Sequence, residues 1–138
     1  MDTETLQSKP LLLSKDNRLF NASLRTFDLP TLIEKMKREN TWAKGGLNAK
    51  ILVNRPYKQI VLTALHKGTE INSFQSNDSI TIQIIEGKLK FHSQKDSIIL
   101  EKDQILTLQE NIEYSLITKA ETVLLLTIAK HTLQPSAN

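Results

Sequence analysis

Cysteine is entirely absent from this 138-residue sequence. Its absence excludes thiol catalysis, disulfide bonds and thiolate metal sites, and it is typical of a protein in a reducing compartment. Only 5% of the residues are aromatic, which leaves few platforms for stacking nucleic-acid bases. The net charge of +3 comes from 18 basic and 15 acidic residues that are spread along the chain rather than clustered. We therefore expect no nucleic-acid partner.

Long apolar runs are also missing. The longest one lies near residues 123–129 and is far shorter than the roughly 20 residues that a helix needs to cross a bilayer. The N-terminal stretch MDTETLQSK is polar and acidic, unlike a secretion signal. These features predict a cytoplasmic protein without a membrane partner, and the length predicts a single domain able to bury a core without disulfides or metals.

The N-terminal part of the chain predicts one helix. Asp28 is a suitable N-cap, Pro30 is tolerated in the first turn, and Asn40 is a suitable end. The apolar residues recur at helical spacing, namely Leu29, Leu32, Ile33 and Met36. The sequence therefore predicts a loose tail over residues 1–20 and a helical segment over residues 21–46, with one amphipathic helix at 29–39.

From residue 47 onward the apolar residues follow the two-residue period of β-strands. Polar turns separate the apolar runs at short intervals, which is typical of an antiparallel sandwich or barrel. The segment 67–78 has no such period and is expected to be a long loop. The predicted strands are 48–54, 58–66, 79–86, 88–93, 97–101, 104–108, 112–118 and 122–130. The sequence therefore predicts a β-domain over residues 47–130 and a frayed tail over residues 131–138.

The clearest hairpin is centred on Gly87, because a tight reversal between two twisted strands often needs a positive φ. Lys88, Lys90 and His92 lie on the polar face of its second strand. The apolar face of the hairpin carries Ile80, Ile82, Ile84, Leu89 and Phe91. One face is thus expected to be buried and the other to face water.

The spacing of Gly68 and Gly87 resembles that of the two glycines in the first motif of the small single-domain cupins, a family of jelly-roll barrels. In that family two histidines and a glutamate between the glycines bind a metal ion. Here Phe74 and Ser76 stand at the histidine positions and Ile80 at the glutamate position. The resemblance implies the scaffold without these three ligands.

The second cupin motif is similar to residues 103–115. Asp103 and Asn111 stand at its two glycine positions, and Tyr114 stands where the fourth ligand, a histidine, would be. The resemblance therefore implies a mostly β, antiparallel cupin-type jelly-roll barrel over residues 47–130, preceded by one N-terminal amphipathic helix. It also implies a degenerate site with no metal and no cofactor.

The same register predicts which residues line the mouth of the barrel. Phe74 and Tyr114 would face each other, either as an aromatic wall for a ligand or as a plug that fills the cavity. His66, two residues before Gly68, would lean over the mouth or lie on the rim without chemistry. The candidate ligand-binding residues are Phe74, Ser76, Ile80, Ile82, Tyr114 and His66.

Two classes of function remain at this level. The first is a metal-free module that binds or senses a small molecule, or serves as an accessory module, and catalyses nothing. The second is an enzyme, either an isomerase or epimerase with Tyr114 as acid and His66 as base, or a metal-dependent oxygenase if the register is wrong.

A homodimer is the partner that the resemblance implies. Residues 58–65 and 122–129 form strands that are apolar on both faces, and both faces of such a sheet must be buried. Either the chain's own helix or a partner subunit would cover the second face.

Overall fold

The computed structural model of the protein describes residues 24–72, 78–110 and 112–130. The predicted tails over 1–20 and 131–138 lie outside these ranges, as do Phe74, Ser76 and Asn111. The described part folds into two helices and nine strands. They are α1 (Leu29–Met36), α2 (Asn40–Ala43), β1 (Asn48–Asn54), β2 (Lys58–Leu65), β3 (Glu70–Asn72), β4 (Ser79–Glu86), β5 (Lys88–Ser93), β6 (Ser97–Glu101), β7 (Ile105–Leu108), β8 (Tyr114–Thr118) and β9 (Thr122–Ala129).

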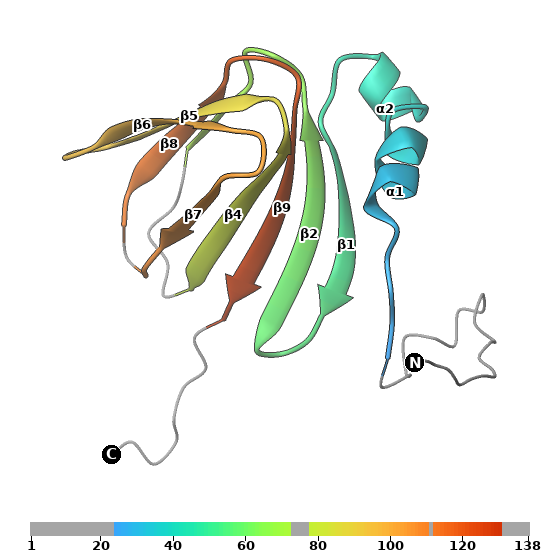
Figure 1. The fold of residues 1–138 in the computed structure, drawn as a ribbon, viewed down its shortest axis with the longest axis horizontal. Coiled ribbons are helices and arrows are strands. Elements are labelled where there is room, and N and C mark those ends of the chain that lie inside the picture. Colours follow the sequence, from blue (N-terminus) through green and yellow to red (C-terminus); the bar gives the residue numbers. More distant parts are fainter. Residues whose placement is uncertain (1–23, 73–77, 111, 131–138) are drawn as a thin grey trace.

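The strands form two antiparallel sheets. The five-stranded sheet has the order β1-β2-β9-β4-β7, and the four-stranded sheet has the order β3-β8-β5-β6 (Figure 1). The two helices lie beside β1 (Figure 1). The mostly β, antiparallel jelly-roll fold that the sequence predicts is confirmed. The two sheets do not close into a continuous barrel, because β6 pairs only with β5 and β7 pairs only with β4 among the described strands.

Two apolar cores lie on opposite faces of the five-stranded sheet. Successive side chains of β9 point to opposite faces of the sheet. Leu124 therefore lies in the core between the two sheets, and Val123 lies in the core on the outer face. The outer face is covered by Ile33, Met36 and Trp42 of the two helices. The chain's own helices therefore cover the second apolar face at this point. The homodimer stays a prediction.

The predicted helix over 29–39 is present but ends at Met36, and a second, four-residue helix follows it. Asp28 caps α1 as predicted, and its carboxylate accepts a hydrogen bond from the Thr31 amide at 3.4 Å. Glu39 is extended, with φ −80° and ψ 152°, and Asn40 begins α2 instead of ending α1. The break brings Trp42 onto the sheet, and the Asn48 side chain of β1 donates to the Met36 carbonyl at 3.1 Å. The Met36 carbonyl also accepts from the Glu39 amide at 3.2 Å, so the end of α1 is bonded both locally and to β1.

The eight predicted strands are all present, with ends within two residues of the prediction. Strand β3 is the one that the sequence did not predict, since residues 67–78 were expected to be a loop. It has three residues and pairs with β8, a partner distant in sequence. Thr118 at the end of β8 fixes the start of this segment, because its hydroxyl donates to the His66 carbonyl at 2.6 Å and accepts from the Thr69 amide at 2.8 Å.

No helix within the described ranges is both long enough and apolar enough to span a membrane.

Asp103 occupies the position at which the cupin resemblance places a glycine, and its φ is +72°. A left-handed conformation costs a β-carbon-bearing residue about 1–2 kcal/mol, and aspartate is among the residues that tolerate it best. We expect Asp103→Ala to be less stable than Asp103→Gly by about 1 kcal/mol, because alanine has neither glycine's freedom nor aspartate's local hydrogen bonds. Urea unfolding of both variants checks this. Equal stabilities would mean that residue 103 is not left-handed in solution.

Candidate functional site

A pocket of about 540 Å³ lies between the two sheets, at the edge where β6 and β7 do not pair. The two edge strands diverge from their connecting turn, as Figure 1 shows. The lining residues come from both sheets, from the β5–β6 turn and from the segment before β8. They are Phe91, Ser93, Gln94, Lys95, Asp96, Ile98, Leu106, Thr107, Leu108, Ile112 and Glu113.

Strand alternation builds the apolar floor of this pocket. Phe91 and Ile98 are cross-strand partners in β5 and β6, so their side chains lie on the same face of the four-stranded sheet. Leu106 and Leu108 share the facing surface of the five-stranded sheet through β7. Each floor residue therefore follows from the two-residue period of its strand. The pocket itself follows from the separation of the two sheets.

The other end of the interior is solidly packed. Leu65, Ile84, Leu89 and Leu124 are each at most 1% exposed and belong to one cluster. Ile80, Leu106 and Tyr114 pack against that cluster but are only partly buried. The interior is thus filled at the end near Thr118 and hollow toward the β5–β6 turn.

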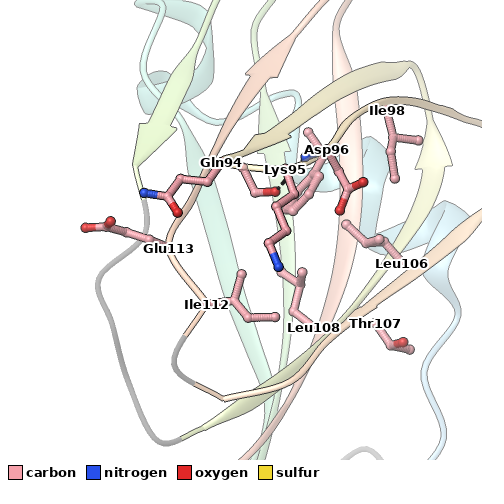
Figure 2. Close-up of a pocket in the computed structure, with 11 residues that line it drawn as sticks. Gln94, Lys95, Asp96, Ile98, Leu106, Thr107, Leu108, Ile112 and Glu113 are labelled. Carbon is pink, nitrogen blue, oxygen red and sulfur yellow. Dashed lines mark hydrogen bonds between the residues drawn. The ribbon is translucent and has the colours of Figure 1, made fainter.

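The β5–β6 turn forms the polar rim of the pocket. The Ser93 amide donates to the Asp96 carbonyl at 2.8 Å, and the Asp96 amide donates to the Ser93 hydroxyl at 3.2 Å. These bonds close the turn and fix the backbone of Lys95 between them. Figure 2 shows the Lys95 side chain running across the pocket toward Leu108 and Ile112, whereas the Glu113 carboxylate points away.

Tyr114 lies at the start of β8 and packs against Phe91, with ring centroids 5.7 Å apart. Burial raises the pKa of its phenol above the usual value, so the hydroxyl stays protonated at neutral pH. Tyr114 lines a second, shallower depression of about 360 Å³ together with Asn72 and His92. Of Ile80, Ile82, His66 and Tyr114, only Tyr114 lines either of these two hollows.

Ile82 lines neither of these two hollows, and its ligand-binding role stays a prediction. Its side chain is 1% exposed and belongs to the solid part of the interior cluster. Ile80 packs against the same cluster and does not line the 540 Å³ pocket. Phe74 and Ser76 lie outside the described residues, so the predicted pairing of Phe74 with Tyr114 stays a prediction.

His66 lines neither of these two hollows, and its ring contacts the second helix instead. Its ring stacks on Trp42 of α2 with centroids 3.5 Å apart, and its Nε2 lies 2.9 Å from the Trp42 carbonyl oxygen. Its Nδ1 is 3.7 Å from a carboxylate oxygen of Glu121. The histidine therefore joins α2 to the end of β2, next to the outer core.

His66 and Tyr114 are at opposite ends of β8. The His66 carbonyl is bonded to Thr118, the last residue of that strand, and Tyr114 is its first residue. With about 3.3 Å per residue, the strand separates the two ends by roughly 13 Å. Neither the 540 Å³ pocket nor the 360 Å³ depression is lined by both side chains. The predicted acid–base pair is not assembled.

Replacing His66 with alanine is expected to lower the free energy of unfolding by about 1–2 kcal/mol, since the aromatic stack and the contact with the Trp42 carbonyl are both lost. Trp42 is the protein's single tryptophan, so the emission of intact protein reports directly on this contact. His66→Phe keeps the stack without the polar contact and should recover about half of the loss. An unchanged emission spectrum in His66→Ala would contradict the stacked arrangement.

Within residues 24–72, 78–110 and 112–130, no three histidine, aspartate or glutamate side chains converge in a way that could hold a metal ion.

Sequence reasoning missed most of the pocket lining. The alternation in 97–101 and 104–108 indicates which residues share a face, and it could have nominated Ile98, Leu106 and Leu108. It gives no sign that β6 and β7 stay apart. Lys95 carried no signal at all, because a lysine in a polar turn is usually solvated.

The sequence matches no protein-family model and no curated protein. Solved structures do match its fold. A cupin superfamily protein from Desulfitobacterium hafniense is similar with a TM-score of 0.65 and 19% identity, over 78% of this chain and 92% of that one. A conserved protein of unknown function from Streptococcus pyogenes is similar with a TM-score of 0.62 and 18% identity, over 79% and 90% of the two chains.

A cupin-2 domain protein from Shewanella frigidimarina is similar with a TM-score of 0.61 and 10% identity, over 76% of this chain and 95% of that one. These likenesses, at low identity, show the architecture of the chain and not its ligand.

Proposed function

We propose that this chain, which has the cupin fold, binds a small molecule in the pocket between its two sheets and serves as a binding, sensing or accessory module. The single observation that carries the proposal is the hollow end of an otherwise packed interior. Its volume of about 540 Å³ lies within the 300–1,000 Å³ typical of small-molecule sites.

The chemistry of the lining supports this proposal. Phe91, Ile98 and Leu106 offer an apolar floor, and Lys95 and Asp96 of the rim offer charged groups. Small-molecule sites combine these two elements, because the apolar surface supplies the free energy of burial and the few polar groups orient the ligand.

An isomerase or epimerase that uses Tyr114 and His66 has no comparable support. The His66 ring stacks on Trp42 at the outer core. The length of β8 separates His66 from Tyr114. Proton transfer requires both groups within hydrogen-bond reach of one substrate or of an intervening water.

Titration with N-phenyl-1-naphthylamine, a neutral fluorophore whose emission rises in apolar surroundings, tests the proposed site. We expect saturable binding that Ile98→Gln weakens about 5- to 10-fold, since about 1–1.4 kcal/mol of apolar contact is lost. Ile99→Gln is the matched control. Ile99 follows Ile98 on β6, is similarly exposed at 45% against 40%, and faces the other side of the sheet.

Ile99→Gln should change the dissociation constant less than twofold. Absence of saturable binding in the unmodified protein, or equal effects of the two variants, would contradict the proposed site.

A further inference from the structure

We infer that the pocket's ligand carries an anionic group and that the Lys95 ammonium binds it while the apolar floor holds the rest of the molecule. This inference rests on the proposed binding function and adds the class of ligand to it. The observation behind it is the placement of one lysine over an apolar surface.

The backbone of Lys95 is held in place by its turn. The two hydrogen bonds between Ser93 and Asp96, at 2.8 and 3.2 Å, enclose Lys95 within the four-residue reversal. From there the side chain extends over the pocket toward Leu108 and Ile112 (Figure 2). The turn thus places an exposed, flexible cation over the pocket floor.

The Lys95 ammonium has no carboxylate partner among the described residues, whereas some other lysines do. Lys37 pairs with Glu86 at 3.0 Å, and Lys88 pairs with Glu101 at 3.4 Å. Among the described residues Lys95 makes no such ion pair, although both Asp96 and Glu113 line the same pocket. Within the described part of the chain, it is the single cation of the lining. Its charge is therefore available to a ligand.

The position of the Lys95 ammonium favours a ligand with an anionic group. An ammonium above Leu108 and Ile112 loses part of its hydration when a ligand fills the pocket, and an anion on that ligand compensates for the loss. Glu113 points away from the pocket in Figure 2, so its repulsion of an anion is weakened by solvent. Since ammonium acts as a point charge, the match is to an apolar molecule with one anionic group and not to a particular head-group shape.

Three ligands of equal chain length test this inference by displacing N-phenyl-1-naphthylamine at pH 7 and low salt: octanoate, 1-octanol and octylamine. We expect octanoate to bind about tenfold more tightly than 1-octanol and octylamine to bind most weakly. In Lys95→Gln the preference for octanoate over 1-octanol should fall below twofold.

Lys90→Gln is the control, because it removes the same charge from the opposite face of β5 and leaves the pocket lining intact. It should keep at least half of the octanoate preference. Both lysines are on the surface, and circular dichroism spectra matching the unmodified protein establish that the variants fold.

Equal affinity for octanoate and 1-octanol would overturn the inference, and so would a preference that survives Lys95→Gln or a preference for octylamine. In these cases the fluorophore still binds and still responds to Ile98→Gln, so the proposed function stands. Failure of the fluorophore to bind would instead remove the proposed function itself.

Discussion

Gly87→Ala is expected to lower the free energy of unfolding by about 4 kcal/mol, an exceptionally large effect for the addition of one methyl group. Gly87 has a φ of +97°, which a residue with a β-carbon rarely adopts. An added β-carbon would also collide with the Glu121 carbonyl oxygen and would lie 2.5 Å from the Thr122 hydroxyl. The contact is with backbone at the start of β9, which cannot move independently.

The collision has a structural reason. Thr122 is fully buried, and its hydroxyl accepts from the Lys88 amide at 3.2 Å and lies 3.1 Å from the Lys88 carbonyl. These hydrogen bonds hold the β4–β5 hairpin close to the start of β9. At residue 87 the space between them is too small for a β-carbon, so only glycine fits. Moving the hairpin to admit a methyl group would break them.

Gly68→Ala separates the steric effect from backbone strain. Gly68 has a similar φ of +84°, but no described atom lies within 4 Å of the point that an added β-carbon would occupy. Its substitution should cost about 1 kcal/mol, the penalty of the left-handed conformation alone. Urea unfolding of both variants gives the comparison. Equal losses would show that the close approach of Gly87 to β9 does not exist in solution.

Ile82→Ala is expected to lower the free energy of unfolding by about 3 kcal/mol, because it removes three buried carbon atoms from a packed cluster and leaves a cavity. Ile82 is 1% exposed and lies among Ile84, Leu89 and Leu124. The matched control is Ile105→Ala, since Ile105 is in the adjacent strand β7 and is 57% exposed. That substitution should cost about 0.5 kcal/mol or less.

Thermal or urea unfolding of the two variants tests the location of Ile82. A loss below about 1 kcal/mol for Ile82→Ala would place that side chain against a solvent-filled space, in keeping with its predicted position at the mouth of the barrel.

The strands were predictable because their signal is local. Residues 79–86 and 88–93 alternate between apolar and polar side chains around a glycine, and the structure has strands with these same bounds. β3 carries no such signal, since it has three residues and depends on β8, more than 40 positions away. The helix break at Glu39 was missed for a similar reason, because the Asn48 side chain of β1 bonds the last residue of α1 from outside the local sequence.

The candidate site was predictable only in part. The cupin resemblance placed Tyr114 in the interior, and its ring does pack against the interior cluster beside Phe91. Ile82 was nominated because alternation places it on the same face of β4 as Ile80, but its side chain is almost completely buried. Facing inward and facing a cavity are different properties, and only the depth of packing distinguishes them.

By itself, the sequence determined the absence of thiol chemistry, the alternation of the strands, and the glycine at position 87, where the hairpin needs a positive φ. Each of these depends on residue type or on neighbours in the chain. Tertiary structure alone decided that His66 stacks on Trp42, that β6 and β7 stay apart, and that Lys95 extends over an apolar floor. These features depend on how strands far apart in sequence pair and where two sheets separate, and no local pattern encodes that.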